Sequence, residues 1–193
     1  MSESNVPRES HFNAAFDEYC TALGHVASIW NHMQEGIGLL FCQLTGLSKT
    51  VGMAIWYSTP SDRSQREMLR AAVGAMPDDF WEKFHAPSAK VDMLWLLSQA
   101  NSLADRRNDA IHAPVSAGII DGIVQIEAFK YHGNPRAQKL YGKEVLNELA
   151  WYRHSAATLF GFARTLNQAV ERLIAWPEKP SMPALVQSKT RKG

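Results

Sequence analysis

Apolar residues recur every three or four positions over two long segments of the chain, at about 13–44 and about 142–175. This spacing places them on one side of an α-helix, so the sequence predicts two helices of roughly 30 residues each. Gly46, just after the first segment, is typical of a helix end. Shorter helices are expected between the two long ones, at 49–57, from 61 or 62 to about 76, at 80–84 and from 88 to about 111.

The segment 115–131 has a different pattern. β-Branched residues occur on both sides of Asp121-Gly122, a two-residue turn typical of a β-hairpin. Pro114 disfavours helical geometry at the residue before it, so the preceding helix should end close to His112. The sequence therefore predicts a mainly α-helical domain, an up-down bundle of four to five helices with one inserted β-hairpin at about 115–131.

The length and composition fit one globular domain. The chain has 193 residues, of which 46% are hydrophobic and 20% are charged, which suffices for a sizeable core. We expect a disordered N-terminus at 1–10, a single helical domain at 11–176 and a disordered tail at 177–193, which holds three prolines and a basic end.

The composition also predicts a cellular setting. No apolar run approaches the ~20 residues of a membrane span, and the first ten residues lack the pattern of a signal peptide. Cys20 and Cys42 would lie about 33 Å apart on one helix, too far for a disulfide. We therefore expect a cytoplasmic protein with no membrane contact. Its formal net charge is only +1, so any RNA contact requires a local basic patch.

One run of residues, from Arg107 to His112 at a predicted helix end, suggests chemistry. Metal-independent RNA cleavage needs a base for the ribose 2′-hydroxyl proton, an acid for the leaving 5′-oxygen and a cation for the phosphate. Histidine, with an unperturbed pKa of about 6.5, suits the proton transfers. Arginine suits the phosphate, because its planar fork donates two hydrogen bonds and stays charged. Asn108 would orient His112 or bind the phosphate.

Helix geometry limits how this site forms. Asn108 and His112 are four positions apart and share one face. Arg107 is five positions from His112, which is about 140° around an ideal helix. The two side chains therefore converge only if the helix has unwound at His112 or if a second copy of the chain contributes one of them. A simpler interpretation also stays open, since histidine and arginine at a helix C-terminus interact favourably with the helix dipole.

The run from Ala104 to Ala113 resembles the motif of the HEPN superfamily, a group of all-helical nucleotide-binding and ribonuclease domains. Members carry an arginine, a polar residue and then a histidine, near a helix end. Ala113 departs from the glycine that often follows the histidine. The resemblance implies that Arg107, Asn108 and His112 are the catalytic residues of a homodimeric, metal-independent endoribonuclease of the toxin or phage-defence type.

The resemblance also leaves a second class open, because many HEPN domains are thought to be non-catalytic. The chain would then be a helical dimerisation or binding module for a nucleotide, for RNA, or for a protein such as an antitoxin. A third alternative is a regulator that binds a small molecule between its helices. The homodimer is expected independently from wide apolar helix stripes, which include Trp30, Trp95, Trp151 and Phe160.

Two other groups of residues are candidate sites. Arg63, Arg66 and Arg70 recur at helical spacing and, together with Arg106, are candidate RNA-binding residues. Glu67 lies among the first three, so an exposed ion-paired face is the alternative. On the first helix, His25, His32 and Glu35 share one face, but no facing partner ligands occur elsewhere. We therefore expect no metal site and no cofactor.

Overall fold

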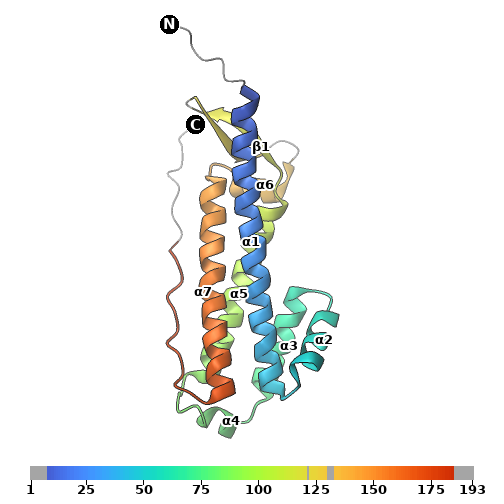
Figure 1. The fold of residues 1–193 in the computed structure, drawn as a ribbon, viewed down its shortest axis with the longest axis vertical. Coiled ribbons are helices and arrows are strands. Elements are labelled where there is room, and N and C mark those ends of the chain that lie inside the picture. The colour runs from blue at the N-terminus through green and yellow to red at the C-terminus, as the bar shows by residue number, and fades with distance from the viewer. Residues whose placement is uncertain (1–7, 121, 130–132, 185–193) are drawn as a thin grey trace. The chain divides into compact units, whose positions relative to one another are not determined.

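The computed structural model describes residues 8–120, 122–129 and 133–184. Seven helices and one two-stranded sheet form this part of the chain (Figure 1). The mainly α-helical bundle with an inserted hairpin is therefore confirmed. The elements in chain order are α1 (Arg8–Thr45), α2 (Lys49–Ser58), α3 (Asp62–Ala75), α4 (Asp78–Glu82), α5 (Ala89–His112), β1 (Val115–Ile120), β2 (Ile123–Ala128), α6 (Pro135–Leu140) and α7 (Val145–Arg172).

The chain divides into two compact units by its internal contacts. The described residues of one are 8–27, 105–120, 122–129, 133–153 and 184; it is called the hairpin unit, because it contains β1, β2 and α6. The other comprises residues 28–104 and 154–183 and is called the α2–α4 unit. Helices α1, α5 and α7 each contribute residues to both units.

The core of the α2–α4 unit is apolar and tightly packed. Trp56, Leu69 and Leu159 are among its fully buried side chains, and burying each large side chain contributes about 1.5–3 kcal/mol. Glycine allows close approach of helices here: a Cβ added at Gly38 would lie 3.0 Å from the indole nitrogen of Trp56. The helix end expected at Gly46 is confirmed, since this residue has a φ of 69°.

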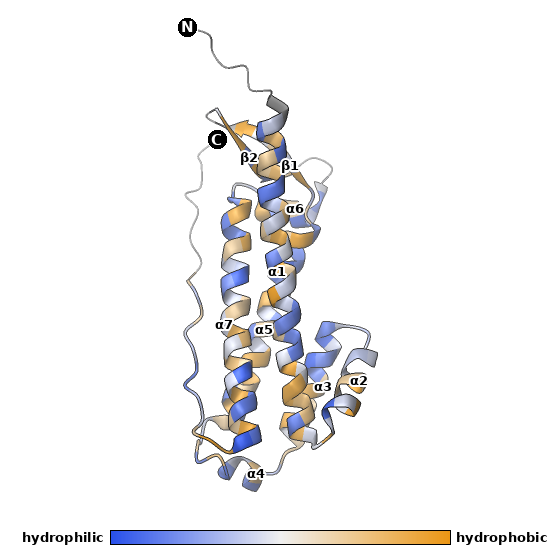
Figure 2. Ribbon diagram, viewed as in Figure 1, coloured by the Kyte–Doolittle hydropathy of each residue, from blue (hydrophilic) through white to orange (hydrophobic). Residues whose placement is uncertain are grey.

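The hairpin unit contains the predicted β-hairpin. Strands β1 and β2 are antiparallel, with Val115 opposite Ala128 at one end and Ile120 opposite Ile123 at the other. Both strands are largely hydrophobic (Figure 2). Gly122 has a φ of 79°, which explains the glycine in this tight turn. Asp121 and the end of the expected segment at 130–131 lie outside the described residues.

Helix α6 was not expected from the sequence. Its N-cap is Asn134, whose side-chain oxygen accepts from the backbone N–H of Arg136 at 2.9 Å and of Ala137 at 3.4 Å. Pro135 occupies the first helical position, where its missing N–H costs nothing. Ala137 and Leu140 are buried, and α6 contacts β2. This short helix is therefore capped at its start and held by its apolar face.

The two ends of the chain differ from expectation where they are described. Helix α1 begins at Arg8, inside the segment 1–10 expected to be disordered. Residues 173–184 have no regular secondary structure, yet Trp176 and Lys179 both contact Asp92. The rest of the expected tail, 185–193, lies outside the described residues, so disorder there stays a prediction. None of the helices described in residues 8–184 is long and apolar enough to cross a membrane.

The packing of α2 on α1 gives a stability test. A Cβ at Gly52 would overlap the sulfur of Cys42 and lie 3.2 Å from its Cβ. We expect Gly52→Ala to lower the free energy of unfolding by about 1–3 kcal/mol in urea denaturation, because the site is overpacked. Gly74→Ala is the matched control: nothing lies within 4 Å of its added Cβ, so it should be neutral or stabilise by up to about 1 kcal/mol.

A double variant separates packing from helix propensity. Cys42→Ala removes the overlapping sulfur, so the pair Cys42→Ala/Gly52→Ala should lose clearly less stability than the two single losses added together. Equal stability of the Gly52→Ala and Gly74→Ala proteins would contradict the close contact of α1 with α2.

Candidate functional site

Helix α5 stays α-helical to its last residue. The backbone N–H of Ala113 donates to the carbonyl of Asp109 at 3.0 Å, the spacing of a regular α-helix. The predicted end at His112 is therefore confirmed, and the last turn has not unwound. Arg107 and His112 consequently project about 140° apart in one chain. Of the two arrangements considered from the sequence, the unwound helix end is excluded by this hydrogen bond.

The three residues of the motif differ in exposure. His112 is exposed at the C-terminal end of α5, whereas Arg107 and Asn108 are half-buried. The Nε atom of Arg107 is fully shielded from solvent. Asn108 lies one turn before His112 on the same helix face. One chain therefore presents the imidazole and the amide on one side and keeps the motif arginine on another.

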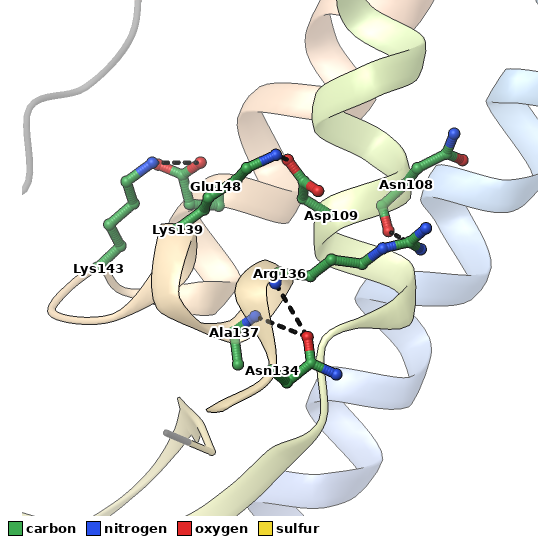
Figure 3. Close-up of polar contacts among 8 residues, drawn as sticks. All are labelled: Asn108, Asp109, Asn134, Arg136, Ala137, Lys139, Lys143 and Glu148. Carbon is green, nitrogen blue, oxygen red and sulfur yellow. Dashed lines mark hydrogen bonds and ion pairs between the residues drawn. The ribbon is translucent and has the colours of Figure 1, made fainter. Parts of the chain in front are cut away.

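Helix α6 braces this end of α5 through two cations (Figure 3). Arg136 donates from Nη1 to the backbone carbonyl of Asn108 at 3.2 Å. Lys139 pairs with the carboxylate of Asp109 at 2.7 Å. Both are favourable at a helix C-terminus, where the backbone carbonyls carry partial negative charge. One short helix thus holds two consecutive residues of the candidate motif.

Arg106 lies beside two aromatic residues of α7. Its guanidinium is 5.3 Å from the ring centre of Trp151, and the Trp151 and Tyr152 rings meet edge-on at 5.2 Å. Burial raises the pKa of the Tyr152 phenol far above its usual range, and the nearby Glu148 carboxylate raises it further. Tyr152 is therefore a neutral phenol at ordinary pH. Arg106 itself is exposed, as an RNA contact requires.

The expected stripe of arginines on α3 does not form as a surface feature. Arg66 is only 2% exposed; its Nε donates to Oδ1 of Asn101 at 2.6 Å, and its guanidinium lies 5.7 Å from the Trp30 ring centre. It therefore holds the core together and cannot follow a phosphate backbone. Arg63 is exposed, and Arg70 pairs with Glu67 at 3.4 Å, as the ion-paired alternative expected.

The histidines weighed as metal ligands have other contacts. The Nδ1 atom of His25 lies 3.4 Å from Nη1 of Arg153, within the hairpin unit. His32 packs on the ring of Phe160 at 5.8 Å, within the α2–α4 unit. Across the described residues, no three His, Cys, Asp or Glu side chains are grouped as metal ligands.

A cavity of about 720 Å³ in the α2–α4 unit was missed from the sequence. It lies between the start of α5 and the segment 173–179. Its wall includes Asp92, a carboxylate that is 3% exposed and accepts from the Trp176 indole at 3.2 Å. His85 and Leu173, two non-glycine residues with φ near 50°, line it as well. The cavity forms because the segment 173–179, after α7, folds back toward the start of α5. The spacing of apolar residues along the sequence does not predict such a contact.

The chain was compared with models of protein families, with curated proteins and with solved structures, and no match was found in any of the three.

The buried position of Arg66 has a measurable consequence. Arg66→Ala should lower the free energy of unfolding by about 2–4 kcal/mol, because it removes the partner of Asn101 and leaves a polar cavity beside Trp30. The matched control is Arg63→Ala, an exposed arginine on the same helix, which should change stability by less than about 0.5 kcal/mol. Equal unfolding midpoints for the two variants would show that Arg66 is not part of the core.

Proposed function

We propose that the chain is a HEPN-like, metal-independent endoribonuclease of the toxin or phage-defence type that acts as a homodimer. The observation that carries this proposal is the exposed His112, placed at the end of a regular helix on the same face as Asn108. An exposed imidazole can exchange protons with a bound substrate near neutral pH. An amide one turn away can hold either the imidazole or a phosphate oxygen.

The reaction consists of one displacement at phosphorus. His112 removes the proton from the ribose 2′-hydroxyl, whose oxygen then attacks the adjacent phosphorus. The bond to the 5′-oxygen breaks, and that oxygen takes a proton from a water molecule, while the protonated His112 returns its proton to the resulting hydroxide. The products are a 2′,3′-cyclic phosphate and a 5′-hydroxyl. A guanidinium stabilises the extra negative charge on the phosphate during this step.

The geometry of α5 supports a homodimer. Because Arg107 and His112 project about 140° apart, one copy does not direct both at the same phosphate. In two copies related by a two-fold axis, the Arg107 of one copy and the His112 of the other can act on the same phosphate. The RNA-binding surface would include Arg106, which is exposed beside the motif.

A non-catalytic dimerisation or binding module is the second candidate. The specific observation in its favour is the half-buried Arg107, whose Nε is shielded from solvent. In such a module the same helix end would contact a nucleotide, RNA or an antitoxin-like protein without cleaving it. Cleavage assays distinguish the two candidates directly.

Substitution of His112 tests the catalytic proposal. In the presence of EDTA, the wild-type protein should cleave single-stranded RNA, and His112→Ala should reduce the rate at least about a hundredfold, as loss of a general acid or base does. His154→Ala removes another exposed histidine, on α7, and should leave the rate unchanged. If RNA is left intact by the wild-type protein, the binding-module alternative is favoured; equal rates for wild type and His112→Ala would rule out the assigned role.

Mixed dimers test whether the site is shared between copies. Chains carrying Arg107→Ala and chains carrying His112→Ala should each be inactive alone. A purified dimer with one chain of each type should recover about half of the wild-type rate, because one of two composite sites is intact. No recovery in a confirmed mixed dimer, or full activity in a strictly monomeric protein, would show that the site does not span two chains.

A further inference from the structure

Arg136 is a cation that the motif does not contain but that contacts the last turn of α5. Its Nη1 donates to the backbone carbonyl of Asn108 (Figure 3). In a regular α-helix, this carbonyl accepts from the backbone N–H four residues later, which here belongs to His112. The guanidinium of Arg136 is therefore anchored at the level of the last turn, between Asn108 and His112.

The position of Arg136 contrasts with that of Arg107. Arg107 projects about 140° away from His112 on the same helix, and its Nε is shielded from solvent. Arg136 approaches α5 from α6 and contacts its backbone at Asn108. His112, four residues later, lies only about 40° around an ideal helix from Asn108. Within one chain, Arg107 points away from His112, and the guanidinium at the last turn of α5 comes from Arg136 of α6 instead.

The guanidinium of Arg136 also retains capacity to bind an anion. It has five N–H groups, and its bond to Asn108 uses one of them. Lys139 and Lys143, the neighbouring cations, are paired with Asp109 and Glu148. By contrast, Arg136 forms no ion pair with any carboxylate in the described part of the chain. It is half-buried, so its position is restrained while part of its surface remains accessible.

Local structure keeps Arg136 in this place. The side chain of Asn134 caps α6 by accepting from the backbone N–H of Arg136 itself. The ion pair of Lys139 with Asp109 holds the next turn of α6 against α5 and neutralises the carboxylate nearest to Asn108 in sequence. The remaining acidic group on this face, Asp105, lies seven residues before His112, about 10 Å along the helix axis. The cations of α6 therefore offset both the nearby carboxylate and the partial negative charge of the carbonyls at the end of α5.

We propose that Arg136 is a further substrate-binding residue, which holds the RNA phosphate at the His112 of its own chain. This inference rests on the proposed function for the identity of the anion. It makes each composite site a set of three groups: His112 and Arg136 from one copy and Arg107 from the other. The fork of Arg136 binds two phosphate oxygens while one N–H remains on the Asn108 carbonyl.

Binding measurements test this inference separately from catalysis. The probe is a fluorescein-labelled, mixed-sequence single-stranded RNA, titrated by anisotropy against protein carrying His112→Ala so that it is not cleaved. Adding Arg136→Ala should weaken binding about tenfold and reduce the slope of log affinity against log salt by about one phosphate contact. Arg136→Lys should restore the salt slope but only part of the affinity, because it keeps the charge and loses the fork.

The matched control is Lys143→Ala, which removes one positive charge of the same region from its ion pair with Glu148. It should leave affinity and salt slope within about twofold of the parent protein. Circular dichroism and thermal unfolding of all variants identify any that fail to fold, and Arg136→Lys then provides the decisive comparison.

The outcomes separate the two proposals. RNA binding with an unchanged salt slope in Arg136→Ala overturns the role of Arg136, whether or not His112 is required for cleavage. A protein that binds RNA through Arg136 but never cleaves it supports this inference and refutes the nuclease. A protein that binds no RNA at any salt concentration refutes both.

Discussion

The hydrogen bond from the Ala113 N–H to the Asp109 carbonyl keeps α5 regular to its last residue, and the candidate site depends on this constraint. A regular helix turns 100° per residue, so residues five apart cannot face one point. With the helix intact, Arg107 and His112 have to act on different sides of one chain. A composite site in a dimer is then the arrangement in which the whole motif meets one phosphate. The Asn108 carbonyl in this last turn also accepts a hydrogen bond from Arg136 of α6.

The segment between α5 and α7 brings Arg136 of α6 to the Asn108 carbonyl. The hairpin begins just after α5. At its other end, the backbone N–H of Phe129 donates to the carbonyl of Pro114 at 2.8 Å, so the chain comes back to the C-terminal end of α5. Helix α6 follows within a few residues and is fixed by its Asn134 cap and its buried Leu140. The surface pair of Lys139 and Asp109 adds little stability, on the order of 1 kcal/mol or less. Its contribution is to orient α6 rather than to hold the fold together.

The sequence predicted those features that depend on neighbouring residues. Helix periodicity, Gly46 as a helix end and Asp121-Gly122 as a hairpin turn are local signals, and the helices and strands follow them. Helix α6 was not predicted, although Asn134-Pro135 is a typical start of a helix. Its six residues are too few to show the helical period of apolar positions. The burial of Arg66 was not predictable from its spacing, since its partner Asn101 is 35 positions away. The position of Arg136 against Asn108 likewise depends on a contact between residues 28 apart.

The most direct measurement of the central claim is the chemistry of the cleaved ends. Attack by the ribose 2′-hydroxyl, with His112 moving protons and no metal ion, predicts 2′,3′-cyclic phosphate and 5′-hydroxyl ends when wild-type protein cuts RNA in EDTA. A DNA strand of the same sequence should stay intact, because it lacks the attacking oxygen. Mass spectrometry of the products reports both results. Ends that carry a 5′-phosphate, cleavage that stops when EDTA is added, or equal cleavage of DNA would contradict the site derived for the end of α5.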